Sequence, residues 1–284
     1  MALRTAPVVG STLSLLRLGA LAGPFYVTVA LAQALTREGF DLSRHPWSFL
    51  ANGELGWIQT ANFVITALAT IAFAIGLRRT LTPAPSSTST PGPSAAPASA
   101  PGSSSASTSA FAPGSASAPA SALTSASVPA PTPAPAPAMP ASGRGSDGRP
   151  SGRGSRWAPR LIAAFGASML GAAIFPADPA MGFPTGTPEG PGTITLSGTL
   201  HMAVGGVGFL CLVAACYVLA SRFSRSGERG WAIYTRITGT LFLGAFLGIA
   251  TGGAIAWANL IFVTAIIAVW CWMSLLSIKF SRNA

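Results

Sequence analysis

The sequence is dominated by long apolar runs separated by short polar stretches. Six runs reach or approach the ~20 residues that a helix needs to cross ~30 Å of hydrocarbon. Their spans are 14–35, 57–77, 160–175, 197–220, 233–251 and 255–278. We expect each span to be helical, because lipid offers no partner to an unpaired backbone amide. The pattern therefore predicts an all-α integral membrane protein, a bundle of six transmembrane helices.

Two of the runs allow a second interpretation. The third is short, so we expect its helix to extend over 157–176 or to be shielded by neighbouring helices. The first contains "VALAQA" (29–34), which has the small-residue spacing of a secretory cleavage site. A signal segment normally has a shorter apolar region than this run, so we interpret it as a membrane span.

Composition and charge agree with a membrane protein. The chain has 284 residues, of which 50% are hydrophobic and only 8% are charged, whereas soluble domains carry about 25% charged residues. The net charge of +10 would suit nucleic acid, but the basic residues lie at the ends of apolar runs, as membrane insertion requires. The predicted partner is therefore the lipid bilayer and not nucleic acid.

The distribution of basic residues predicts the orientation. Six spans place both termini on one side and the loops 36–56 and 176–196 on the other. Of 17 Lys and Arg residues, only Arg37 and Arg44 fall in these two loops. Cytoplasmic loops carry the excess of Lys and Arg. We therefore expect cytoplasmic termini, with both histidines and five of the seven acidic residues at the outer face.

A long segment of different composition divides the chain. Between Arg79 and Arg144 there is no charged residue, and Ala, Pro, Ser, Thr and Gly predominate. Such a stretch cannot bury enough apolar area to offset the entropy of ordering it. We expect 80–156 to be a disordered cytoplasmic linker between the first two helices (1–79) and the last four (157–284).

Small residues at helical spacing predict close helix packing. Gly19 and Gly23 recur at a four-residue interval, as do Gly244 and Gly248. Such stripes let helix backbones approach one another in a membrane. In the fourth span His201 lies on the same face as two glycines, so we expect it to point toward other helices rather than toward lipid.

Candidate chemistry collects in the two outer loops. Pro46 suits the first turn of a short helix and Asn52-Gly53 suits its end. Because Phe40, Trp47, Phe49 and Leu50 are apolar, we expect this helix to lie in the interface or to cap the bundle. The candidate catalytic residues are His45, Asp178 and His201. The candidate ligand-binding residues are Arg44, Ser48, Gln59, Asn62, Glu189 and Ser197. We expect the three catalytic candidates to form one polar cluster at the outer mouth of the bundle.

Three kinds of chemistry would use such a cluster. A carboxylate can orient an imidazole as a general base, with water, Ser48 or Ser197 as nucleophile. Two histidines and one or two carboxylates can hold Zn²⁺. The cluster can also bind a substrate or ion without reacting. The structural alternatives are that Asp178 caps a helix, that His201 bonds a neighbouring helix, and that Arg44 pairs with an acidic residue.

No local motif decides among these readings. The chain has no HExxH, GxSxG, GxGxxG or P-loop pattern, so nothing local indicates a catalytic or nucleotide-binding site. We therefore assign no metal ligand, and the cofactor stays unknown, with haem between the histidines as a weak alternative. The three cysteines form no metal spacing and are interpreted as buried, inert thiols.

Three stretches together resemble a known family. They are "LSRHPWSFLANGELGWIQTANFVITALATIAFAIGLRR" (42–79), "FPADPAMGFPTGTP" (175–188) and "SGTLH" (197–201). They resemble the prokaryotic membrane proteins grouped as domain-of-unknown-function family 998, over all six spans but not the linker. The resemblance implies a multi-pass protein of the cell membrane with no established activity. It implies as motif positions Arg44, His45, Ser48, Gly56, Trp57, Gln59, Asp178, Pro179 and His201.

The sequence thus predicts a multi-pass membrane protein with a polar pocket at its extracytoplasmic mouth and no assignable reaction. One alternative is a membrane-embedded hydrolase or transferase acting on a lipid or prenyl substrate. The arrangement is loosely similar to membrane hydrolases related to alkaline ceramidases, although two histidines cannot build their three-histidine metal set. The other alternative is a transporter or scaffold, for which the bundle midplane offers only Thr66, Ser168 and Asn259. The oligomeric state stays open.

Overall fold

The computed structural model describes residues 6–82, 154–252 and 255–284. These residues form six α-helices and one short 3-10 helix. They are α1 (Ala6–Thr36), η1 (Trp47–Ala51), α2 (Gly56–Leu81), α3 (Gly154–Ile174), α4 (Leu196–Arg225), α5 (Arg229–Gly252) and α6 (Ala256–Arg282). Each of the six α-helices contains a stretch that is long and apolar enough to cross a bilayer. The predicted all-α, six-helix, multi-pass membrane fold is confirmed.

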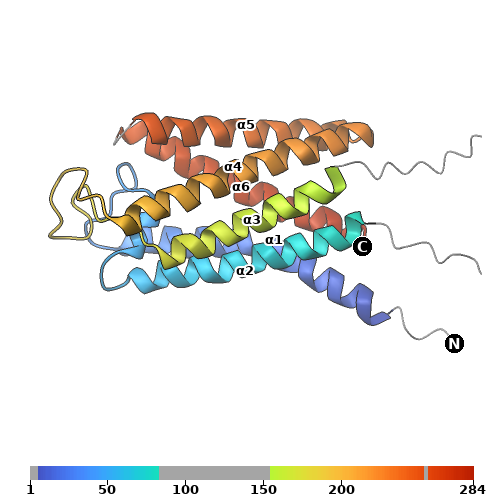
Figure 1. The fold of residues 1–284 in the computed structure, drawn as a ribbon, viewed down its shortest axis with the longest axis horizontal. Coiled ribbons are helices and arrows are strands. Elements are labelled where there is room, and N and C mark those ends of the chain that lie inside the picture. Colours follow the sequence, from blue (N-terminus) through green and yellow to red (C-terminus); the bar gives the residue numbers. More distant parts are fainter. Residues whose placement is uncertain (1–5, 83–153, 253–254) are drawn as a thin grey trace, which may run out of the picture. The chain divides into compact units, whose positions relative to one another are not determined.

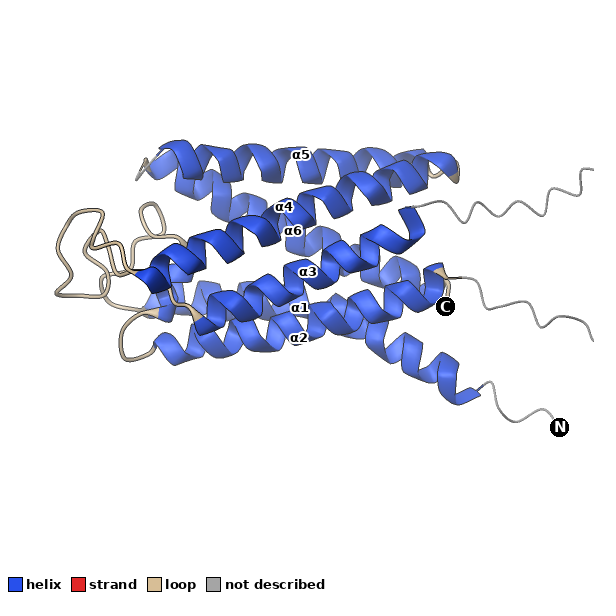
Figure 2. Cartoon of the chain, viewed as in Figure 1, coloured by secondary structure: helices blue, strands red, loops and turns tan. Residues whose placement is uncertain are grey.

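The six helices form a closed ring. Each packs on the next in chain order, from α1 to α6, and α6 packs back on α1. Contact across the ring is slight and occurs between α2 and α6. The start of α1 and the end of α6 lie at one end of this bundle, called here the terminal end (Figure 1). The segments 37–55 and 175–195 gather at the opposite end, called here the loop end (Figure 2).

Most helices extend past the predicted spans at the terminal end. Helix α4 continues to Arg225 and α6 to Arg282, each ending with basic residues in its last turn. A hydropathy pattern reports where hydrocarbon ends, whereas a helix ends where its backbone groups find other partners. Leu81 and Gly154 also belong to helices, so both ends of the expected 80–156 linker are helical. The rest of that segment, 83–153, lies outside the described residues.

The glycines of α1 confirm the predicted close packing. A β-carbon added at Gly19 would lie 2.6 Å from the Phe73 ring on α2. One added at Gly23 would lie 2.8 Å from the carbonyl oxygen of Trp270 on α6. Real β-carbons do not approach so closely. The absence of a side chain at these two positions is what brings α1 against both neighbours.

Helices α4 and α5 are close at one end only. Near the terminal end a β-carbon at Gly239 would lie 2.8 Å from that of Cys216. Toward the loop end the two ribbons spread apart (Figure 1), and Gly205 has no atom of a neighbouring helix beside it. Gly244 and Gly248 also face open space. The predicted close packing at these two glycines is therefore wrong, because α5 turns them away from its neighbours in the chain.

Candidate functional site

The short helix η1 closes the loop end of the ring. It begins after Pro46 and ends at Asn52, as the sequence predicts, and it packs on α1 and α2. Trp47 and Leu50 are 1% and 0% exposed, so η1 caps the bundle rather than lying on its outside. Arg37, just past the end of α1, donates to the carbonyl oxygens of Leu50 at 2.5 Å and Asn52 at 2.6 Å. These charge-assisted bonds satisfy the C-terminal carbonyls of η1 and fix its position.

His45 joins the two loops through both of its ring nitrogens. Its Nδ1 accepts the backbone N–H of Asp41 at 2.8 Å, and its Nε2 bonds the carbonyl oxygen of Met181 at 2.9 Å. Because a carbonyl can only accept, Nε2 carries the proton and the ring is neutral. The side chain is 2% exposed. This candidate catalytic residue therefore has no ring nitrogen left for a substrate, a metal or a second side chain.

Asp178 caps the start of α4. Its Oδ2 accepts the backbone N–H of Thr195 at 2.8 Å and its Oδ1 accepts the Thr195 hydroxyl at 2.5 Å. The Thr195 hydroxyl oxygen in turn accepts the N–H of Gly198 at 3.1 Å. The hydrogen bond from the Thr195 side chain is the main reason that the pKa of Asp178 lies below its ordinary value. Ser197, a candidate ligand-binding residue, donates its hydroxyl to the carbonyl oxygen of Pro176 at 3.0 Å.

His201 is buried against the end of α3. It is 6% exposed, as its position on the inner face of α4 predicts. Its Nδ1 lies 2.8 Å from the carbonyl oxygen of Phe175. Since that oxygen can only accept, Nδ1 carries a proton and donates it to Phe175. His201 therefore ties the outer turn of α4 to the residue that follows α3.

Arg44 and Glu189 form an ion pair between the two loops. The Nη2 of Arg44 lies 2.7 Å from Oε2 of Glu189, and the side chains are 42% and 72% exposed. The carboxylate of Glu189 raises the pKa of Arg44 above its ordinary value through this hydrogen bond. Exposed pairs of this kind contribute little to stability, because water screens the two charges. The pair therefore orients the loops more than it stabilises the fold.

Gln59 and Asn62 lie between α1 and α2 rather than in the loop region. Gln59 Oε1 accepts from Gln33 Nε2 at 2.9 Å and from Asn62 Nδ2 at 3.2 Å. Asn62 Oδ1 accepts the hydroxyl of Thr66 at 3.3 Å. All four side chains are buried. Such bonds join neighbouring transmembrane helices, although Gln33 Oε1 and Gln59 Nε2 are buried without a hydrogen-bond partner.

The three candidate catalytic residues do not share a hydrogen bond. His45 bonds Asp41 and Met181, Asp178 bonds Thr195, and His201 bonds Phe175. Asp178 and His201 are near enough to interact electrostatically. Across residues 6–82, 154–252 and 255–284, no three His, Cys, Asp or Glu side chains come together as a possible metal site.

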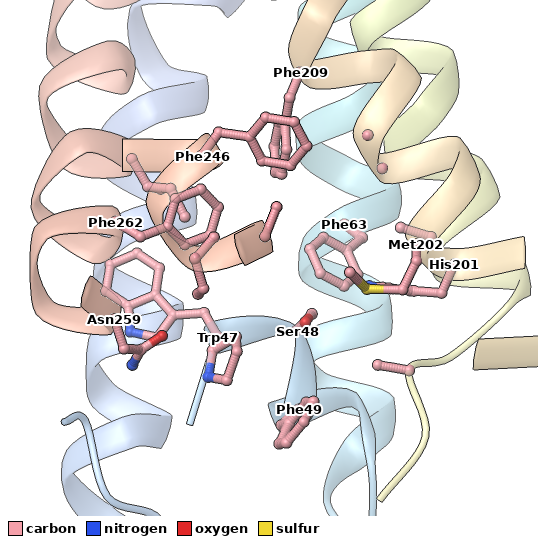
Figure 3. Close-up of a pocket in the computed structure, with 18 of the residues that line it drawn as sticks. Trp47, Ser48, Phe49, Phe63, His201, Met202, Phe209, Phe246, Asn259 and Phe262 are labelled. Carbon is pink, nitrogen blue, oxygen red and sulfur yellow. The ribbon is translucent and has the colours of Figure 1, made fainter. Parts of the chain in front are cut away.

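A cavity of about 560 Å³ lies inside the ring of helices, beneath η1. Four of the nine candidate residues line it, namely Arg44, Ser48, Glu189 and His201. The other five do not line it. His45, Asp178 and Ser197 make hydrogen bonds within the loop end, and Gln59 and Asn62 make hydrogen bonds between α1 and α2. The cavity also contacts Trp47 and Asn259 on one side and His201 and Met202 on the other (Figure 3). A volume in the range ~300–1,000 Å³ is typical of small-molecule sites.

The walls of the cavity are aromatic and aliphatic. The side chains that line its deeper part come from α3 to α6, namely Phe165, Met169, Phe209, Phe242, Phe246, Phe262 and Trp270. Between α4 and α5 the lining includes Gly205 and the exposed Met202 and Ala250. The cavity therefore reaches the outer surface of the bundle where these two helices spread apart. The charged lining side chains Arg44 and Glu189 are paired with each other.

The sequence reading identified none of these aromatic residues as functional. A phenylalanine in a membrane span carries no local signal that separates a cavity wall from a packed core. The sequence indicates Asn259 only as a polar residue of the bundle midplane. The structure places it one turn into α6, at the loop end, where it is 4% exposed.

A family model described as "Protein of unknown function (DUF998)" matches residues 20–96 and 139–279. The chain belongs to this family. The match confirms the resemblance drawn from the loop motifs and the spans. Comparisons with curated proteins and with solved structures returned no match.

In this DUF998 protein the motif glycine Gly56, and Gly198 in the stretch "SGTLH", stand where a side chain would collide with the loops. A β-carbon at Gly56 would lie 2.2 Å from the carbonyl oxygen of Ala51, at the end of η1. One at Gly198 would lie 2.0 Å from the Asp178 carboxylate that caps α4. Trp57, another motif position, is 67% exposed on the outside of α2. The two glycines therefore serve the cap of the bundle, since each lets a loop group reach a helix start.

Proposed function

We propose that this protein binds a lipid-like molecule in the cavity beneath η1, at the extracytoplasmic face of the cell membrane. The observation that carries the proposal is the cavity itself, which is large, walled by aromatic side chains and continuous with the bundle surface between α4 and α5. An apolar cavity of this kind suits an alkyl or isoprenoid chain. The activity is binding, with no chemical step.

The length of the cavity supports a ligand from a single leaflet. Its lining on α6 runs from Asn259 to Trp270, a separation of about 16 Å at the ~1.5 Å rise of an α-helix. On α4 it runs from His201 to Phe209, about 12 Å. The hydrocarbon core of a bilayer is ~30 Å thick. A chain of one leaflet therefore matches the cavity, whereas a molecule that spans the membrane does not.

The opening between α4 and α5 supports entry from the bilayer. Met202 is 67% exposed and also lines the cavity. Gly205 has open space where a side chain would otherwise extend. An apolar molecule can then move from lipid into the protein without crossing water, which is the step that the hydrophobic effect makes costly.

Binding is better supported than hydrolysis or transfer. The two ring nitrogens of His45 and the carboxylate of Asp178 are bonded to loop backbone and to Thr195. His201 lines the cavity, but its hydrogen bond goes to the carbonyl oxygen of Phe175 and not to a carboxylate or a serine. A general base needs a free nitrogen or oxygen within reach of its nucleophile. The hydrogen-bonded side chains of Gln59, Asn62 and Thr66 lie between α1 and α2 and do not line the cavity. They therefore form no polar path through the cavity, which favours a bound ligand over transport.

Charge asymmetry supports the proposed orientation. Basic residues end three helices at the terminal end, as Arg78 and Arg79, Arg222 and Arg225, and Lys279 and Arg282. The loop end carries Arg37 and Arg44 with Glu38, Asp41, Glu54, Asp178 and Glu189. Since the excess of Lys and Arg marks the cytoplasmic side, the cavity would belong to the outer leaflet.

Filling the cavity with a side chain tests the proposal. Gly205→Leu places a side chain where open space lies beside the cavity, and it removes a helix-destabilising glycine at a gain of ~0.5–1 kcal/mol. Gly244→Leu is the matched control, because Gly244 also has open space beside it but lies on α5 away from the lining. Both variants should fold.

The measurement is labelling by a long-chain diazirine probe, followed by mapping of the labelled peptides. We expect the wild type and Gly244→Leu to be labelled on α4, α5 and α6. Labelling of Gly205→Leu should be roughly tenfold weaker than that of the wild type, equivalent to ~1.4 kcal/mol of binding free energy. Equal labelling of all three proteins, or labelling only on the outside of the bundle, would refute the proposal.

A further inference from the structure

We propose that the bound molecule carries a neutral hydroxyl head group, which Trp47 and Asn259 recognise together. This inference rests on the proposed lipid-binding function and adds the chemistry of the polar end. Its basis is a hydrogen-bond donor and a hydrogen-bond acceptor at the same side of the cavity, both buried and both without a partner. Figure 3 shows the two side chains next to each other.

The orientation of the Asn259 amide is set by its neighbours. Its Nδ2 donates to the carbonyl oxygens of Leu42 at 2.8 Å and His45 at 3.1 Å. A carbonyl oxygen can only accept, so the amide nitrogen must face these two groups and Oδ1 must face away from them. Oδ1 has no hydrogen-bond partner, and the residue is 4% exposed. Asn259 therefore presents a fixed acceptor.

Trp47 supplies the donor. Its indole Nε1–H, which can only donate, is buried and has no partner. The side chain is 1% exposed and lies 5.9 Å from the Tyr26 ring, centroid to centroid. A buried polar group without a hydrogen bond destabilises the protein, because its hydration is lost without compensation. A ligand that satisfies both groups regains that free energy.

A hydroxyl is the smallest group that meets both requirements. Its oxygen can accept from Trp47 Nε1–H while its proton is donated to Asn259 Oδ1. An ionised carboxylate or a phosphodiester has no proton to donate and would turn a negative oxygen toward Oδ1. An ammonium group can only donate and leaves the indole unpaired.

Charge at the site also favours a neutral head group. Among the lining residues of the described chain, Arg44 is the only arginine or lysine, and it is paired with Glu189 at the rim. Ser48 adds an uncharged hydroxyl to the wall near Trp47 (Figure 3). A charged head group would be transferred from water to this region without a counter-charge, which is strongly unfavourable.

Four competitors with the same chain test the head group on the unaltered protein. Hexadecanol, hexadecyl methyl ether, hexadecane and hexadecanoate at pH 8 would displace a diazirine-bearing hexadecanol. We expect hexadecanol to compete about tenfold more strongly than its methyl ether, because the ether cannot donate to Asn259. Hexadecane and hexadecanoate should be weaker than the ether.

A single substitution separates the two recognition groups. Trp47→Phe removes the indole N–H and keeps an aromatic ring, so hexadecanol and its ether should both lose about tenfold while hexadecane is unaffected. Trp272→Phe is the control, since Trp272 is also fully buried but donates to Thr235 at 3.1 Å and lies outside the cavity lining. It should leave all four affinities as in the wild type.

The outcomes distinguish this inference from the function on which it rests. If hexadecane or hexadecanoate competes as strongly as hexadecanol, the hydroxyl assignment is wrong while lipid binding stands. The hydroxyl assignment is also wrong if the methyl ether competes as strongly as the alcohol for the wild-type protein. This comparison does not depend on the folding of any variant. If the probe labels no residue of the cavity, the proposed function itself fails.

Discussion

Replacing His45 by alanine separates a structural histidine from a catalytic or ligand-binding one. The imidazole joins the two loops, with Nδ1 accepting from Asp41 N–H and Nε2–H donating to the Met181 carbonyl. Alanine removes both bonds and leaves a void, since the side chain is 2% exposed. We expect a less stable protein whose cap over the cavity is loosened.

The magnitude follows from these contacts. Two hydrogen bonds contribute ~0.5–1.5 kcal/mol each, and the void left by a buried side chain adds a further ~1 kcal/mol. The free energy of unfolding should therefore fall by about 3 kcal/mol. At ~2–4 °C for each kcal/mol, the melting temperature should fall by about 6–12 °C.

Thermal unfolding in one detergent, followed by intrinsic fluorescence, measures this change. His45→Asn should lose about half as much, because the amide oxygen of asparagine can still accept from Asp41 N–H but its side chain is too short to reach Met181. Arg44→Ala, which removes only the exposed pair with Glu189, should lower the melting temperature by no more than about 4 °C. A His45→Ala protein that melts like the wild type yet no longer binds the diazirine probe would refute the structural reading.

Two further predictions concern the cap of α4 and the orientation. Asp178→Ala should lower the melting temperature by about 2–4 °C, as for one lost helix cap. Because the hydrogen bond from Thr195 lowers the pKa of Asp178, the stabilisation is present above the ordinary carboxyl value of 3.8 and is lost as pH falls through the folded-state pKa. Melting curves of wild type and Asp178→Ala should therefore converge in acid, and curves that stay parallel would contradict this. A cysteine at the exposed Thr185 should react with a membrane-impermeant maleimide on intact cells, whereas one at the exposed Ser226 should not. The host protein should have its three native cysteines replaced, and the reverse pattern would overturn the proposed orientation.

The sequence was sufficient to predict the six helices and the short helix at Pro46. Long apolar runs leave few alternatives, because the bilayer allows only helices or closed barrels to cross it. The ends of the helices were less predictable. Hydropathy changes at the edge of the hydrocarbon, whereas α4 begins at the cap that Thr195 and Asp178 provide. That cap depends on a residue of the preceding loop, so only the folded chain shows it.

The sequence predicts a polar pocket at the mouth of the bundle, but the apolar cavity could not be predicted from it, because this cavity arises from the way two helices diverge. Glycines at regular spacing on α5 predicted close packing, yet Gly244 and Gly248 face open space. The same residue type that brings α1 against its neighbours leaves α4 and α5 apart near Gly205. Whether a glycine marks a contact or a gap depends on which face its helix turns inward, and spacing alone does not give that rotation.

The residues at the loop end fall into two groups with different physical roles. His45 and Asp178 make their hydrogen bonds within the cap, and Gly198 leaves the space that the Asp178 carboxylate occupies. Trp47 and Asn259 retain an unused donor and acceptor at the cavity. Buried polar groups are almost always paired within the protein. Among the buried side-chain atoms of the described residues that have no partner, these two are the ones whose residues line the cavity, so they are the better indication of where a ligand binds. The loop motif is then understood as the frame that holds Trp47 over the cavity, since Asn259 is itself held by the carbonyl oxygen of His45.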